Sequence, residues 1–243
     1  MTHKILAALL ILFLGVAASL QARTVQVWFD TSGSLNTDIL SPAYGELSLI
    51  VTGAEGVGSI EVFGFASGVD ALRMPMVTLP VPVRPKAATC DAEGEGELGI
   101  FKNQADEEKG KCAKEQDAKA AQHQSQIKAL STRLVTHLQS LERQPTSRQS
   151  CVLQAVARCL TEGPEYFCLI ITDGVQEACP APRVPPYPSG ARVIVLLVPR
   201  QGDGGSASEL LSARSKAIQR FAPQASVVPL FRASTELPSL IRK

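Results

Sequence analysis

Short apolar runs alternate with segments of helical spacing along most of the chain. Runs rich in β-branched and aromatic residues predict strands at Thr24–Phe29, Ser59–Phe65, Tyr166–Thr172, Ala191–Val198 and Ser226–Phe231, with a proline-interrupted edge strand at Met74–Val83. Helical spacing predicts helices at Glu46–Val51, Ser208–Phe221 and Thr235–Lys243. Continuous apolar strands that alternate with helices are typical of a parallel sheet covered on both faces. We therefore expect an α/β fold, with a doubly wound, mostly parallel central sheet flanked by helices.

A long polar segment interrupts this alternation between about residues 85 and 145. Its first part, Cys90–Lys111, is charged and contains glycine, which predicts a loop, whereas Ala113–Arg143 contains little that would stop a helix. Apolar residues recur at three- and four-residue spacing in the second half of that helix, at Ile127, Leu130, Leu134, Leu138 and Leu141. We expect a long helical insertion that packs on the sheet through this seam and projects into solvent at its N-terminal half. The alternative for the seam is a coiled-coil contact with a partner.

The N-terminus has the pattern of a secretory signal peptide. Lys4 provides the positive charge, Ile5–Leu20 is uncharged and mostly apolar, and small residues lead to Ala22. We expect cleavage after Ala22, which leaves one domain at residues 23–243 with no further membrane span; an uncleaved anchor is the alternative. The chain is then exported, to the periplasm or outside the cell, and the compact signal favours a bacterial source.

Six cysteines remain after this segment, and an even number in an oxidising compartment favours disulfides. The sequence does not fix their pairing. Position along the chain suggests the pairs Cys90–Cys112, Cys151–Cys179 and Cys159–Cys168. Cys168 lies inside an apolar strand, so a buried apolar role is its alternative.

Charge and histidine content exclude several functions. Lys and Arg number 24 against 23 Asp and Glu, without a basic cluster, so we expect no nucleic-acid partner. Only three histidines are present, His3, His123 and His137, none of them near a candidate nucleophile, and no Gly-x-Ser-x-Gly motif occurs. These counts disfavour a Ser–His–acid triad, and the even number of cysteines disfavours a cysteine nucleophile.

Oxygen-bearing side chains follow two of the predicted strands. Asp30, Ser32 and Ser34 come directly after the first strand, at alternate positions around a glycine that permits a tight turn. Asp173 follows Tyr166–Thr172 and precedes Gly174. Each motif alone also fits an ordinary turn or helix cap. Together at two strand ends, where parallel sheets bind ligands, they favour a site for a hard cation such as Mg²⁺.

These motifs resemble those of a known family. Val27–Leu35 is similar to the first strand and metal-ion-dependent adhesion site of the von Willebrand factor A domain, which has a Rossmann-like fold. Leu169–Gly174 looks like the Thr-Asp-Gly motif after the fourth strand of that family. The resemblance covers about Arg23 to Lys243, apart from the segment Pro85–Pro145. It implies that Ser32 and Ser34 are direct hydroxyl ligands, and that Asp30 and Asp173 act through water or hydrogen bonds.

The family also supplies a threonine from a loop before a helix. Thr146 is the candidate here, because Thr146 and Gln149 fit a capping box that opens a helix running to about Leu160. The family has glycine before this threonine, where the present chain has Pro145. That departure leaves two alternatives for the third hydroxyl, Ser147 and Ser150.

The resemblance implies a binding or adhesion protein rather than an enzyme. The cofactor would be Mg²⁺, with Mn²⁺ or Ca²⁺ as alternatives, and the partner would be a protein or surface ligand that offers an acidic group. A stiff proline-rich loop after Asp173 would form a rim around the ligand through Glu177, Arg183 and Tyr187; a rigid connector between strands is the alternative. Two alternatives remain: a structural component of an envelope, conjugation or secretion assembly held by the inserted helix, and a metal-dependent hydrolase.

Overall fold

The computed structural model describes residues 23–66, 75–90, 99–143, 150–176, 179–180, 182–183, 190–204 and 207–242. The strands are β1 (Arg23–Asp30), β2 (Val57–Phe65), β3 (Val77–Pro80), β4 (Tyr166–Thr172), β5 (Arg192–Leu197) and β6 (Ser226–Pro229). The helices are α2 (Thr37–Thr52), α3 (Gly99–Glu142), α4 (Val152–Cys159), α5 (Ala207–Phe221) and α6 (Ala233–Arg242), with a 3₁₀ turn, η3 (Leu230–Arg232), after β6. The predicted signal peptide lies outside the described residues.

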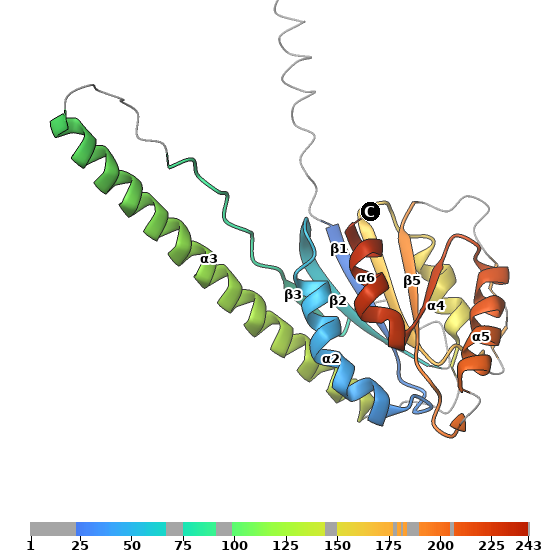
Figure 1. Ribbon diagram of the computed structural model, residues 1–243. Helices are drawn as coiled ribbons and strands as arrows, with labels where there is room; N and C mark the ends of the chain where they lie inside the picture. The colour runs from blue at the N-terminus through green and yellow to red at the C-terminus, as the bar shows by residue number, and fades with distance from the viewer. Residues whose placement is uncertain are drawn as a thin grey trace, which may run out of the picture.

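The strands form one sheet in the order β3-β2-β1-β4-β5-β6 (Figure 1). Every neighbouring pair is parallel except β2 and β3, which are antiparallel. The predicted α/β class with a mostly parallel sheet is therefore confirmed. The chain winds outward in both directions from β1 and β4, so the strand order reverses between them. Such a switch point is where open α/β sheets place their ligand sites.

Helices cover both faces of the sheet, and the alternation along β1 assigns its side chains to two cores. Val25, Val27 and Phe29 are buried with α2, α3 and α6 on one face. Trp28 is buried with α4 and α5 on the other face, where its ring stacks on Phe63 with centroids 4.3 Å apart. Because side chains alternate along a strand, residue 30 follows Trp28 onto the second face.

Helix α3 is longer than the sequence pattern predicted. The expected loop up to residue 111 was wrong in part, since residues 99–111 are helical. That stretch is rich in strong helix formers, its one interior glycine costs only about 1 kcal/mol, and Glu107 and Lys111 form an ion pair one turn apart at 2.9 Å. The N-terminal half of α3 projects beyond the sheet in Figure 1. The predicted disulfide Cys90–Cys112 joins it to the chain that follows β3.

The apolar seam of α3 packs as expected. Four of its leucines are buried in the first core, namely Leu130, Leu134, Leu138 and Leu141, and Ile127 is half-buried. A short hydrogen bond of 2.6 Å between the hydroxyls of Ser48 and Ser131 fixes α3 against α2. The C-terminal half of α3 is thus part of the domain core, whereas its side chains between residues 107 and 126 are mostly exposed.

Several predicted boundaries were wrong by a few residues. The edge strand β3 covers only Val77–Pro80, because the prolines around it provide no amide donor for a ladder. Strand β6 ends at Pro229 and passes into the 3₁₀ turn. Helix α4 begins at Val152, so Thr146 is not its N-cap, and its N-cap position, Cys151, makes no side-chain cap hydrogen bond.

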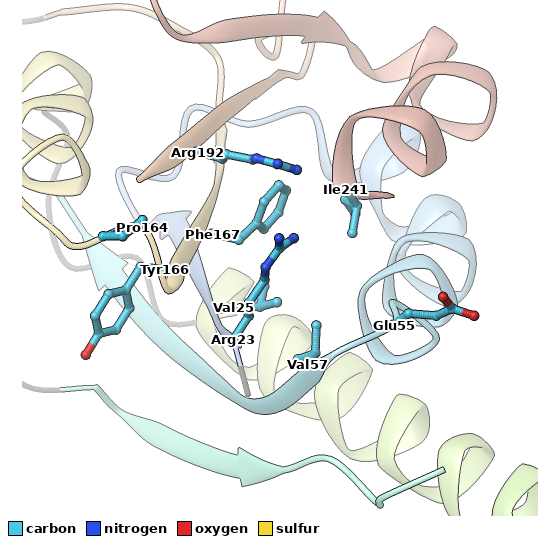
Figure 2. Close-up of a pocket in the computed structure, with 9 residues that line it drawn as sticks. All are labelled: Arg23, Val25, Glu55, Val57, Pro164, Tyr166, Phe167, Arg192 and Ile241. Carbon is cyan, nitrogen blue, oxygen red and sulfur yellow. The ribbon is translucent and has the colours of Figure 1, made fainter. Parts of the chain in front are cut away.

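The two ends of the parallel strands differ in chemistry. Asp30 and Asp173 lie at the carboxyl ends of β1 and β4. The amino ends of β1, β4 and β5 line an open pocket that contains two arginines, Arg23 and Arg192 (Figure 2). Two aspartates thus lie at one end of the parallel strands and two arginines at the other. No helix among the described residues is long and apolar enough to cross a membrane.

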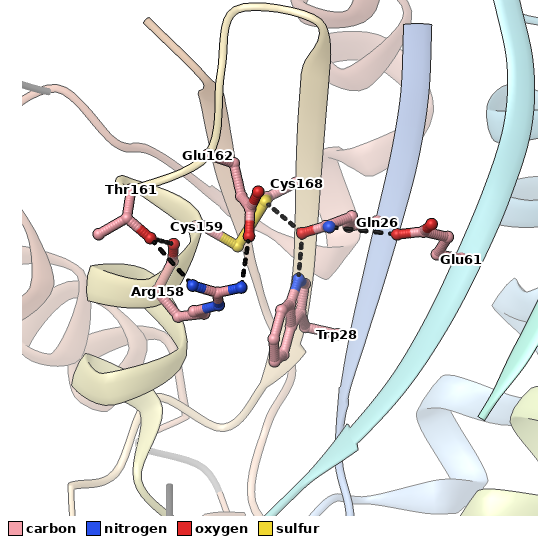
Figure 3. Close-up of a disulfide and its surroundings, with 8 residues drawn as sticks. All are labelled: Gln26, Trp28, Glu61, Arg158, Cys159, Thr161, Glu162 and Cys168. Carbon is pink, nitrogen blue, oxygen red and sulfur yellow. Dashed lines mark hydrogen bonds and ion pairs between the residues drawn. A yellow bond between two sulfur atoms is a disulfide. The ribbon is translucent and has the colours of Figure 1, made fainter. Parts of the chain in front are cut away.

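A disulfide between Cys159 and Cys168 joins the end of α4 to β4 (Figure 3). Both cysteines are completely buried in the second core. Beside them, the side-chain oxygen of Gln26 accepts a hydrogen bond of 3.2 Å from the Trp28 indole, and its amide donates to Glu61 at 3.2 Å. The predicted pairing is confirmed, and Cys168 is also a buried core residue.

We expect Leu138→Ala to lower the free energy of unfolding by about 2–5 kcal/mol, since it leaves a cavity between α3 and the sheet. The control Gln124→Ala, at an exposed position on the projecting half of α3, should change it by less than about 0.5 kcal/mol. Urea denaturation followed by circular dichroism measures both values. Equal effects of the two substitutions would contradict the packing of α3 described above.

Candidate metal site

The carboxylate of Asp30 is the centre of a hydrogen-bonded cluster at the carboxyl ends of β1 and β4. Its Oδ2 accepts hydrogen bonds from the hydroxyls of Ser150, at 2.6 Å, and Thr172, at 2.7 Å. Its Oδ1 accepts one from the backbone amide of Ser32, at 3.0 Å. The side chain is 1% exposed. Asp30 therefore joins three segments that are far apart in the sequence.

The loop after β1 presents two hydroxyls at one point. The Oγ atoms of Ser32 and Ser34 lie 2.7 Å apart. Gly33 between them has a φ of 75°, a backbone conformation that glycine adopts without strain. Thr31 faces elsewhere, with its hydroxyl donating to the carbonyl of Phe65 at 3.1 Å. The alternate spacing read from the sequence thus brings the two serine hydroxyls together, whereas the hydroxyl of Thr31, between Asp30 and Ser32, is directed to β2.

Asp173 is fully buried next to this cluster. Its Oδ1 accepts a hydrogen bond of 2.9 Å from the amide of Val175. Its Oδ2 is buried and has no hydrogen-bond partner. Gly174 is required after it, because φ is +76° and a Cβ there would meet the side chain of Leu197 at 2.7 Å. Buried carboxylate oxygens usually accept a hydrogen bond, and an ordered water or an ion can supply the partner here.

Arg200 is the cation that lies nearest to this oxygen. Its Nε is 3.9 Å from Asp173 Oδ2, and its side chain is 34% exposed. The loop that carries it is fixed to the loop after β1 by a β-bridge between Leu35 and Arg200 and by a hydrogen bond of 3.0 Å from Gln201 N to the carbonyl of Ser34. Arg200 therefore belongs to the wall of the site, and no sequence motif pointed to it.

The predicted third hydroxyl is described only in part. Thr146 and Ser147 lie outside the described residues, whereas Ser150, the other alternative, is buried and donates to Asp30. The disulfide between Cys151 and Cys179 is present as predicted. It joins the start of α4 to the segment after Asp173, which places both beside the cluster.

Only part of the predicted rim lies within the described residues. Arg183 is exposed, while Glu177 and Tyr187 lie outside the described residues. What the described residues add is Gln176, whose side chain accepts a hydrogen bond of 3.1 Å from the amide of Leu153 and donates one of 3.3 Å to the carbonyl of Cys179. Gln176 thus supports the disulfide-linked segment and was not among the predicted residues.

The pKa of Asp30 reflects several opposing effects in this cluster. Burial raises the pKa of Asp30 above its usual range, and the negative charge of Asp173 adds to that rise. The hydrogen bonds from Ser150, Thr172 and Ser32 act in the opposite direction and lower the pKa of Asp30. Two buried acids side by side favour either protonation or a positive charge between them.

The donor set fits a hard cation. Hydroxyl and carboxylate oxygens are the ligands that Mg²⁺ prefers, and an unpartnered oxygen on Asp173 is available to hold water on such an ion. The described residues contain no cluster of three or more His, Cys, Asp or Glu side chains, so an ion here would rely on the serine hydroxyls and water in addition to the two aspartates. The oxygen donors present are of the type that the predicted cation takes as ligands.

Comparison with known proteins identifies no relative. No protein-family model matches the chain, and neither a curated protein nor a solved structure matches it.

We expect Asp30→Asn to make the metal-free fold less sensitive to rising pH. Because the pKa of Asp30 is raised in the folded state, the unfolded chain ionises first, near 3.8, and stability falls until the pH passes the folded pKa. Each pKa unit of that rise changes the free energy of unfolding by about 1.4 kcal/mol. In EDTA, the stability of the variant relative to the natural chain should increase between about pH 4 and pH 7. A difference that stays constant or decreases over this range would contradict the assignment.

Proposed function

We propose that this chain is an exported binding module of the von Willebrand factor A type. It captures a protein or surface ligand through a divalent cation, Mg²⁺ or alternatively Mn²⁺ or Ca²⁺, which an acidic group of the ligand helps to coordinate. It acts by binding and does not catalyse a reaction. Helix α3 is then an insertion into the family's fold. The three disulfides are consistent with export.

One observation carries this proposal. Asp30 and Asp173 are both buried at the switch point of the sheet, beside a pair of hydroxyls, and an oxygen of Asp173 has no hydrogen-bond partner. Buried carboxylates are normally paired or bound to a metal. A cation held mainly by neutral hydroxyls stays electron-poor, so it attracts an acidic oxygen from outside.

The roles follow from the contacts of each residue. Ser32 and Ser34 supply the direct hydroxyl ligands, because their oxygens converge. Asp30 orients the loop through the Ser32 amide, and Asp173 holds water on the ion. For the third hydroxyl the prediction stays Thr146, with Ser147 and Ser150 as alternatives; of these, Ser150 lies within the described residues and contacts Asp30.

A second candidate function rests on the projecting half of α3. Its side chains between residues 107 and 126 are mostly exposed, and the disulfide Cys90–Cys112 fastens it to the chain after β3. A structural component of an envelope or secretion assembly would dock through such an arm. The two candidates differ in one requirement: docking through α3 needs no cation, whereas capture at the carboxyl ends of the strands does.

We expect saturable binding of Mg²⁺ or Mn²⁺ to the exported chain in isothermal titration, and its complete loss in Asp30→Ala. Ser34→Ala, which removes one direct ligand from a half-buried position, should weaken binding at least about tenfold. Ser59→Ala is the matched control, because it breaks a similar hydroxyl pair, with Thr24 at 3.1 Å, at the opposite end of the sheet. Metal affinity that is unchanged in Ser34→Ala but reduced in the control would refute the assignment.

We expect Arg200→Gln to bind the cation about three- to tenfold more tightly than the natural chain, since the guanidinium near Asp173 repels a positive ion. The same variant should be less stable in EDTA, because a buried carboxylate loses its nearest positive charge. Arg220→Gln makes the same change of charge at an exposed position on α5 and should alter neither value. Weaker metal binding by Arg200→Gln would show that Arg200 supports the site instead of competing with the ion.

A further inference from the structure

The pocket at the amino ends of the strands lies at the end of the sheet opposite Asp30 and Asp173. It is a shallow depression open to solvent, formed by the amino ends of β1, β2, β4 and β5 together with α6 and the loops that precede β2 and β4. Its lining residues are mainly apolar or cationic and include Val25, Val57, Phe167, Ile241, Arg23 and Arg192. Nothing in the proposed cation site requires this pocket.

Two guanidinium groups point into the same space. Figure 2 shows the side chains of Arg23 and Arg192 directed toward the middle of the pocket, with the ring of Phe167 between them in this view. Both arginines are half-buried. The Nη1 of Arg192 is fully buried and has no hydrogen-bond partner. A buried guanidinium nitrogen without an acceptor is costly, and so are two like charges that share one pocket.

The single carboxylate in the lining does not neutralise this charge. Glu55 forms an ion pair of 2.8 Å with Arg84, and its side chain is 81% exposed. In Figure 2 its carboxylate points away from the two guanidinium groups. Within the part of the chain that the structure describes, neither Arg23 nor Arg192 has an ion pair, so the pocket keeps an excess of positive charge.

Apolar walls determine which anion fits. The side chains of Val25, Val57, Phe167 and Ile241 surround the guanidinium groups. Such walls strengthen a charge-assisted hydrogen bond, because they reduce the local dielectric constant. An apolar group on the ligand would bury its surface against these walls and strengthen binding. A free phosphate ion has no such group. Guanidinium groups bind carboxylates through two parallel N–H···O hydrogen bonds.

We propose that this pocket binds a carboxylate carried on a small apolar group. The carboxylate accepts hydrogen bonds from the guanidinium groups of Arg23 and Arg192, and the apolar group packs against Phe167 and Ile241. This site is separate from the cation site and does not depend on the proposed function.

The test is isothermal titration of the exported chain, with its disulfides intact, at constant ionic strength. Benzoate is the probe, benzamide is its neutral counterpart, and acetate and phosphate test the part played by the apolar group. Two charge-assisted contacts should give a dissociation constant in the range of about 1 mM or lower for benzoate. We expect weaker binding of acetate and phosphate and no binding of benzamide.

Substitutions assign the binding to this pocket. Arg192→Gln and Arg23→Gln should each weaken benzoate binding about tenfold or more. Arg192→Lys, which keeps the charge but loses the two-pronged geometry, should recover only part of the loss. Arg220→Gln on α5 is the control for net charge and should bind benzoate normally. Because these arginines lie at the protein surface, thermal unfolding should show that each variant is folded.

Three results would overturn the proposal. The first is the absence of saturation by benzoate at about 20 mM, where a millimolar site would be mostly filled. The second is benzoate binding that survives Arg192→Gln. The third is equal affinity for benzoate, acetate and phosphate, which would show that the apolar walls do not contribute to ligand selectivity.

Discussion

The structure depends on one buried carboxylate. Asp30 ends the central strand β1 and accepts hydrogen bonds from the loop that follows it, from β4 and from the segment before α4. These three segments come from both halves of the chain, so their relative positions are fixed at this point. The three donors offset the cost of burying Asp30 only in part, because burial removes its charge from water and Asp173 places a second negative charge beside it. A positive charge at this place would stabilise the whole arrangement.

Other elements of the fold position the segments around the carboxyl ends of β1 and β4. Helices cover both faces, the disulfide Cys151–Cys179 holds the segment after Asp173 against α4, and the loop carrying Arg200 is paired with Leu35. Arg200 is a weak substitute for a metal ion, since its Nε is 3.9 Å from Asp173 and a third of its side chain is exposed. A site whose nearest positive charge is a weakly paired arginine can release that arginine and bind a metal ion from solution instead. The opposite end of the sheet has two arginines, Arg23 and Arg192, where we propose a second and separate binding site.

The sequence predicted the features that depend on local pattern. Strand periodicity placed Asp30 and Asp173 at strand ends, alternate spacing paired Ser32 with Ser34, and the leucine seam placed the second half of α3 in the core. Features that depend on tertiary contact were missed. Arg200 comes from a loop with no motif, and its role arises from pairing with a segment about 165 residues earlier in the chain. The start of α3 was misplaced because a charged, glycine-containing stretch has the composition of a loop, although its helix propensity is high. The position of Thr146 was inferred from a capping box, but α4 begins later, at Val152.

The most direct test of the central claim is a crystal structure of the exported chain soaked with Mn²⁺, with anomalous diffraction used to locate the ion. We predict a single strong peak between the loop after β1 and Asp173, within coordination distance of the hydroxyl oxygens of Ser32 and Ser34, with Arg200 displaced from Asp173. Diffraction that shows no ion there, while the two serine hydroxyls stay bonded to each other and Arg200 stays beside Asp173, would contradict the account.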